Sequence, residues 1–149
     1  MHASEPSFEI DDLRAWLGLD LAATRQALGP SSSVVEGSGY QQTTDLTMVW
    51  NKVERVGWVA YLSEGRVVLL HAQPVPARDV HTAIHEALGE PELTLASRAA
   101  KQAVQWVWPE QGVALSRQGD RTDFVDVFTP CSADDYRARW YRAPDEFTR

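Results

Sequence analysis

Three short apolar runs follow one another in the first half of this chain, with only brief connections between them. They are LTMVW (46–50), GWVAYL (57–62) and RVVLLHA (66–72). Alternating and β-branched runs of this length favour β-strands, and the connection SEG, which contains Gly65, has the length of a hairpin turn. A chain with this pattern has to build antiparallel sheet from strands that are neighbours in sequence.

Helical spacing precedes these strands. The segment EIDDLRAWLG (9–18) predicts a helix that ends at Gly18, and LDLAATRQALGP (19–30) predicts a second helix with Asp20 as N-cap. The next segment, SSSVVEGSGYQQTTD (31–45), has no apolar period and several turn formers, so we expect a loop there. The apolar stripe of the first helix consists of Ile10, Leu13, Trp16 and Leu17.

The same order of elements recurs in the second half. The segment DVHTAIHEALGEP (79–91) predicts a helix with Asp79 as N-cap. After a loop, three strands are predicted by AVQWVW (103–108), GVALSR (112–117) and DFVDVFTP (123–130). Each half therefore reads as a helix, a loop and a three-strand antiparallel meander.

A short identity supports a duplication, because Ala27-Leu28-Gly29 matches Ala87-Leu88-Gly89. We predict an α+β fold in which two tandem helix–β-meander repeats, about residues 8–74 and 78–130, form one antiparallel sheet with helices packed on one face. The chain, residues 1–149, is expected to be a single domain.

The C-terminal segment predicts a last helix over residues 132–143. Ser132 would be its N-cap, and Pro144 would end it. Tyr136 and Trp140 stand at i and i+4, so one aromatic edge of this helix is expected to dock on the rest of the protein.

Composition and charge bound the function. The 149 residues are 44% apolar and 23% charged, and 14 basic against 21 acidic residues give a net charge of −7. That charge argues against a nucleic-acid partner and suits a basic protein partner. We see no signal-peptide pattern and no apolar run long enough to span a bilayer. We therefore expect a cytoplasmic protein without a membrane partner, with a secreted mature form left open.

Few residues suggest catalysis or metal binding. His81 and His85 stand at i and i+4, but the glutamate of an HExxH motif and a third ligand are missing, so we expect no metal. Cys131 is the single cysteine and precedes a predicted helix N-terminus, which would lower its pKa; we interpret it as a structural thiol. No nucleotide-binding or hydrolase motif is present, so we expect no cofactor and favour a protein that is not an enzyme.

Aromatic residues carry the strongest functional signal. Trp106 and Trp108 are two residues apart in a strand and must share a face, and we expect at least one of them to be exposed. Phe124 and Phe128 share a face with Asp126, which is an odd companion for a core. Exposed tryptophan and tyrosine beside acidic residues are typical of protein-binding surfaces. The predicted partner-binding residues are Trp50, Trp58, Tyr61, Trp106, Trp108, Glu110, Asp126 and Phe128.

Turn chemistry gives the two halves a family resemblance. The helix end Leu88-Gly89-Glu90-Pro91 and the turn from Trp108-Pro109 to Gly112 resemble the small α/β repeat of SmpA/BamE-type outer-membrane lipoproteins. Two such repeats in tandem are similar in layout to the β-lactamase-inhibitory proteins. The chain departs from the lipoprotein pattern because it has no lipobox cysteine and no cysteine pair. The resemblance implies a sheet with helices on one face and its other face available to a protein.

Three functions are consistent with these patterns. The first is a protein-binding module without enzymatic activity, for example an inhibitor or a bacterial immunity protein that presents an aromatic, acid-rimmed sheet face. The second is a small-molecule binder or small enzyme with a pocket between sheet and helices, in which His71, His81 or Cys131 would be the polar groups. The third is a structural or chaperone-like accessory module.

Overall fold

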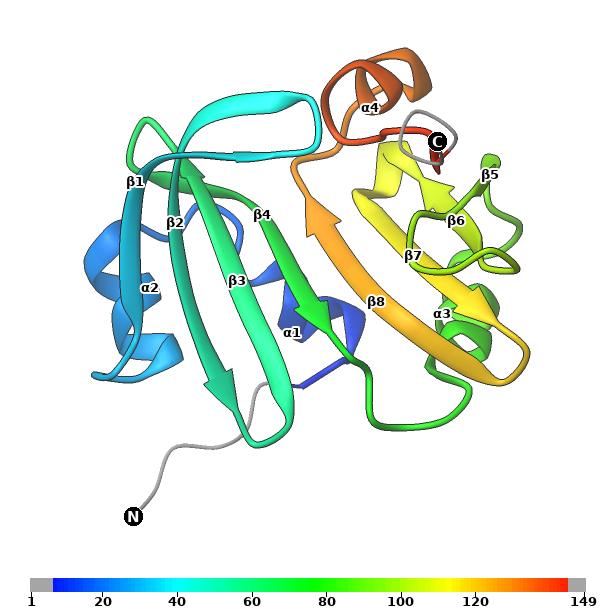
Figure 1. Cartoon of the computed structure of the whole chain (residues 1–149), viewed down its shortest axis with the longest axis horizontal. Helices are drawn as coiled ribbons and strands as arrows, with labels where there is room; N and C mark the ends of the chain where they lie inside the picture. Colours follow the sequence, from blue (N-terminus) through cyan, green and yellow to red (C-terminus); the bar gives the residue numbers. More distant parts are fainter. Residues whose placement is uncertain (1–6, 145–149) are drawn as a thin grey trace.

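One open antiparallel sheet organises the molecule, as predicted. The computed structural model describes residues 7–144 and contains eight strands in the order β1-β2-β3-β4-β8-β7-β6-β5, with β1 and β5 at the two edges (Figure 1). Every pair of neighbouring strands is antiparallel. The strands are β1 (Ser33–Tyr40), β2 (Thr43–Val53), β3 (Val56–Ser63), β4 (Arg66–Gln73), β5 (Leu93–Ala96), β6 (Val104–Trp108), β7 (Val113–Gln118) and β8 (Arg121–Phe128).

Tight turns fix the register of the inner strands. Glu64 and Gly65 both have positive φ, 51° and 79°, between the paired residues Ser63 and Arg66. This is the two-residue turn whose twist matches that of the flanking strands, so the SEG segment forms the predicted hairpin.

The two edge strands were not predicted. Residues 33–40 and 93–96 lie in segments that we expected to be loops, but they form β1 and β5. Most of their side chains are exposed or half-buried, so they carry little apolar periodicity, and backbone pairing with β2 and β6 holds them. Each half therefore contributes four strands instead of a three-strand meander.

Reading outward from the central β4–β8 pair, the halves follow the same order, β4-β3-β2-β1 and β8-β7-β6-β5. An order of strands does not by itself demonstrate a repeat, so the tandem duplication stays a prediction.

Three helices cover the first face of the sheet. They are α1 (Ile10–Arg14), α2 (Leu21–Leu28) and α3 (Val80–Leu88), and they bring Leu13, Leu28 and Ile84 into a core with Trp58 and Leu70. The first helix is shorter than predicted, and Trp16 and Leu17 follow it. These helices lie behind the sheet in Figure 1.

The two predicted N-caps behave differently. The Asp20 side chain accepts a hydrogen bond from the Ala23 amide at 2.8 Å, as expected. Asp79 makes no capping bond, because its backbone is left-handed with φ of 60°. Thr122 on β8 replaces it: its hydroxyl accepts from the His81 backbone amide at 3.0 Å.

The last helix, α4 (Ala133–Arg139), packs on the second face of the sheet. Ser132 caps it by accepting from the Asp135 amide at 3.1 Å, and Tyr136 and Trp140 dock together against Phe128, as predicted. The helix ends at Arg139, before the predicted position 143. The helices therefore cover both faces, and the β1–β2 hairpin bends toward α4, where the Gln42 amide donates to the Arg139 carbonyl (Figure 1).

Candidate functional site

The eight predicted partner-binding residues do not form one surface. Trp58 and Trp108 are 1% and 3% exposed beneath the helices of the first face. Tyr61 and Phe128 are buried on the second face with α4. Glu110 is exposed in the short 3-10 turn between β6 and β7, and Trp50 is exposed on β2 in the other half of the fold. Side chains alternate between two faces, helices α1, α2 and α3 cover the first face and α4 covers part of the second, so these eight residues do not form the one open aromatic face that we predicted.

Trp106 and Trp108 share the first face, as the strand period requires. Their ring centroids are 6.3 Å apart at 84°. Trp108 is buried and donates its indole N–H to the Gly89 carbonyl at 2.9 Å, while Trp106 is half-buried between His85 and the Arg117 guanidinium. We expected at least one of them to be exposed, but Trp108 is buried and Trp106 is only half-buried.

Asp126, the predicted odd companion of the core, is paired on the second face. It lies opposite His71 in the central β4–β8 pair, and its Oδ1 is 2.5 Å from His71 Nδ1. Its other oxygen accepts a hydrogen bond from the Tyr40 hydroxyl at 2.9 Å. With only 2% of its surface exposed, the carboxylate depends on these partners.

The surroundings of the His71 ring favour its protonated form. The second ring nitrogen of His71, Nε2, is 2.7 Å from the acceptor Oε1 of Gln73, so both ring nitrogens face acceptors. Burial is the largest influence and lowers the pKa of His71, but the charge and hydrogen bond of Asp126 together with the Gln73 bond outweigh it and raise the pKa.

Three tyrosines surround the same carboxylate. Burial and then the negative charge of Asp126 raise the pKa of Tyr61 to about 12 and hold the pKa values of Tyr40 and Tyr136 well above the ordinary value. All three phenols are therefore neutral hydrogen-bonding groups near neutral pH.

A hollow of about 570 Å³ opens beside this pair on the second face, and we call it the His71 hollow. Its walls come from the end of β1, the end of β4 with the turn that follows, the loop after β5 and the start of β8. The lining residues are Tyr40, Gln41, His71, Gln73, Pro74, Val75, Arg98, Ala99, Arg121, Thr122, Asp123 and Phe124. This volume is within the usual range for small-molecule sites.

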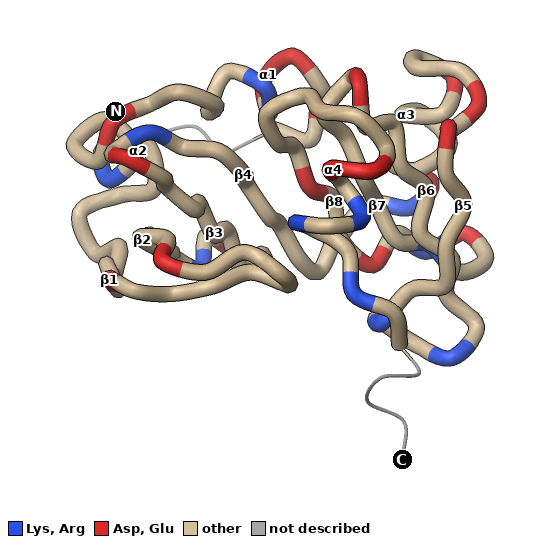
Figure 2. Tube along the Cα trace, turned by 90° about the horizontal axis from the view of Figure 1, so that it is seen from above, with Lys and Arg blue, Asp and Glu red and all other residues tan. Residues whose placement is uncertain are grey.

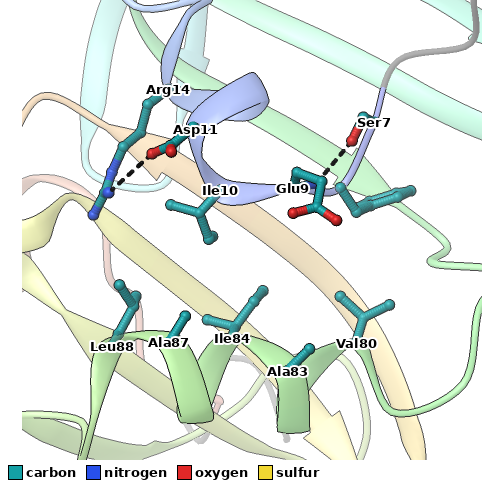
Figure 3. A pocket seen from close by; sticks show the side chains of 11 residues that line it. Ser7, Glu9, Ile10, Asp11, Arg14, Val80, Ala83, Ile84, Ala87 and Leu88 are labelled. Atoms are coloured by element: carbon teal, nitrogen blue, oxygen red, sulfur yellow. Dashed lines mark hydrogen bonds and ion pairs between the residues drawn. The ribbon is translucent and has the colours of Figure 1, made fainter.

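A second hollow, of about 450 Å³, lies between α1 and α3 (Figure 3). Ile10 faces Ile84 and Leu88 across it, and Arg14 at the rim is 4.0 Å from Asp11. Its facing walls are largely aliphatic, and the charged groups named here stand at the rim. None of its lining residues belongs to a strand, so it is not the predicted pocket between sheet and helices, and it holds none of the expected polar groups His71, His81 or Cys131.

The other candidate residues have structural partners. The His81 ring bonds to the Thr122 hydroxyl at 2.8 Å, and His85 pairs with Glu90 at 2.9 Å. Within residues 7–144, no group of three or more His, Cys, Asp or Glu side chains is placed to hold a metal. Burial and then Asp135 raise the pKa of Cys131, so the predicted lowering by the helix N-terminus was wrong.

Sequence reasoning missed Tyr40, Gln73 and Arg121 as parts of a site. Tyr40 lies in the segment expected to be a loop, and the other two flank strand ends. The usable signal was the placement of Asp126 between Phe124 and Phe128, which marks a buried charge that needs a partner.

Comparison with protein-family models, with curated proteins and with solved structures found no match. Across residues 7–144, no helix combines the length and apolar character needed to cross a membrane.

Proposed function

We propose that this protein binds a small molecule in the His71 hollow. The observation that carries the proposal is the buried His71–Asp126 pair at its floor. Burying two charges is unfavourable, and well-packed apolar residues in their place are often as stable or more so. A buried pair that borders an open hollow therefore favours a functional role over a stabilising one.

The geometry allows the Nε2 atom of His71 to bind a ligand. Asp126 fixes the ring of His71 through Nδ1, and Nε2 points to the amide oxygen of Gln73, whose residue is exposed. A ligand acceptor can take the place of that amide oxygen without disturbing the buried side of the pair. Among residues 7–144, no serine, threonine or cysteine side chain hydrogen bonds to His71, so we propose binding without a covalent step.

Filling the hollow tests the proposal. Ala99 is an exposed residue of its wall, whereas Ala96 is exposed on β5 and does not line it. We expect ligand-observed NMR with acetate, benzoate, inorganic phosphate, benzamide and benzylamine to detect binding that Ala99→Trp abolishes and Ala96→Trp preserves. Binding that is insensitive to Ala99→Trp, or no binding by any of the five compounds, would count against the proposal.

A second candidate, a protein-binding module, is supported by an exposed apolar patch on the second face. Val35 and Trp50 are 43% and 41% exposed, and Met48 and Val59, which pair with them across the strands, are half-buried. The edge strand β1 carries part of this patch. The net charge of −7 suits a basic partner.

Capture experiments distinguish this candidate. We expect the wild-type chain on a resin to retain a basic protein from lysate, and a Val35→Ser/Trp50→Ser variant to lose it. Leu21 on α2, 40% exposed on the other side of the sheet, provides the matched control Leu21→Ser. Equal capture by all variants would contradict a role of the patch.

A further inference from the structure

The His71 hollow has more cationic than anionic groups around it. Arg98 on the loop after β5, Arg121 at the start of β8 and His71 line it together with one carboxylate, Asp123, and a second carboxylate, Asp126, is bound to His71. The whole chain carries a net charge of −7, so this balance is a local inversion. Figure 2 shows basic segments close together where the loop after β5 passes the segment that follows α4. The Tyr141 hydroxyl joins these two segments by donating a hydrogen bond to the Ala96 carbonyl at 2.8 Å.

Both carboxylates of the hollow already have donors. Asp126 is shared between His71 and Tyr40. Asp123 accepts from the Ser116 hydroxyl at 2.9 Å and from the side chains of Gln118 and Arg121 at 3.0 and 3.2 Å. Carboxylates held in this way have little remaining capacity to recognise a cationic ligand.

Arg121 has N–H groups available to donate hydrogen bonds to a ligand. Arg121 contacts Asp123 through Nε, and within the described residues no hydrogen bond involves its two terminal nitrogens. A planar guanidinium of this kind recognises carboxylate oxygens through paired hydrogen bonds. Its side chain is 64% exposed, so its terminal nitrogens are accessible to a ligand while Nε keeps its contact with Asp123.

Apolar side chains also line the hollow. The Phe124 ring lies 5.2 Å from the His71 ring, centroid to centroid, and Pro74 and Val75 also belong to the lining. A planar hydrophobic group can pack there with its polar end toward His71 and Arg121.

We infer that the His71 hollow accepts a small organic anion, a carboxylate attached to a flat apolar group, with the carboxylate between Arg121 and His71 Nε2 and the apolar group against Phe124. The inference rests on the proposed small-molecule function and narrows its ligand class.

Three compounds with the same ring and different charge test it. Benzoate, benzamide and benzylammonium are titrated into the full-length protein while the backbone amide resonances of Gln73, Ala99 and Phe124 are followed by NMR. We expect benzoate to shift all three and to bind about ten-fold more tightly than benzamide, with no binding of benzylammonium.

Substitutions of Arg121 test whether its positive charge binds the carboxylate. Arg121→Gln is expected to weaken benzoate about ten-fold and leave benzamide unchanged, and Arg121→Lys to retain part of the affinity. Arg55, exposed at the β2–β3 turn and outside the hollow, gives the control Arg55→Gln, which should bind benzoate as the wild type does.

The outcomes separate the two proposals. Equal affinity for benzoate and benzamide at these amides would overturn the anion class and leave small-molecule binding standing. Benzoate binding that Arg121→Gln does not change would overturn the role of the guanidinium. If none of the three compounds shifts these amides while acetate or inorganic phosphate binds in the hollow, the ligand class is overturned and small-molecule binding stands; if none of the five compounds binds, both are contradicted.

Discussion

The two faces of the sheet bury different chemistry. On the first face, Trp58, Leu62 and Leu70 form an apolar core with the helices, and a buried polar group such as Thr24 serves a helix turn by donating to the Asp20 carbonyl. On the second face, His71 and Asp126 lie at the centre of the sheet. We expect from this comparison that the first face supplies more of the stability, and we propose that the second face carries a recognition site.

The largest expected effect tests the first face. Trp58 is 1% exposed and contacts the rings of Phe8 and Trp16, so Trp58→Ala should lower the free energy of unfolding by about 4 kcal/mol. Urea denaturation followed by circular dichroism measures this. A loss as small as that of an exposed residue would show that the first face is not the stabilising one.

A slightly smaller effect is expected when the pair on the second face is broken. Asp126→Ala leaves the imidazolium of His71 and the Tyr40 hydroxyl buried without their acceptor, and we expect a loss of about 3 kcal/mol in the free energy of unfolding. The control is His71→Phe/Asp126→Leu, in which both charges are replaced by apolar side chains; its stability should be close to that of the wild type. If the double variant were as unstable as Asp126→Ala, the His71–Asp126 pair would be needed for the stability of the fold.

The pair also predicts how stability depends on pH. Because the folded-state pKa of His71 is raised, its contribution is fully present below the ordinary histidine pKa of about 6.5 and is lost as pH rises through the folded value. The groups facing His71 are Asp126, Tyr40 and Gln73. The unfolding free energy of the wild type minus that of the double variant should be largest below about pH 6.5 and should decrease as the pH rises above it. A difference that grows with pH would reverse the assigned shift.

The smallest effect is expected at the exposed patch. Trp50→Ser and Leu21→Ser remove side chains that are 41% and 40% exposed on opposite sides of the sheet, and each should change the unfolding free energy by no more than about 0.5 kcal/mol. Thermal melting of the two variants beside the wild type measures this. A clearly larger loss for Trp50→Ser would make Trp50 part of the second-face core and remove the reason to propose it as a binding surface.

The site was only half predictable. His71 was a candidate polar group of a pocket, and the position of Asp126 between two phenylalanines marked it as unusual. The pairing of β4 with β8 joins residues 71 and 126 directly, and this contact between the two halves leaves no trace in local periodicity. We expected the pocket between sheet and helices, whereas the His71 hollow lies on the second face. Nothing in the sequence indicates that α4 packs on that face.

The sequence by itself determined the six inner strands, the antiparallel α+β class and the Asp20 and Ser132 caps, since these depend on alternation, turn residues and local hydrogen bonds. Only the tertiary structure decided the edge strands, the burial of Trp58 and Trp108 and the assembly of the His71 hollow. Those features depend on which distant backbone pairs with an edge and which helix covers a face, and such contacts are set by the packing of the whole chain.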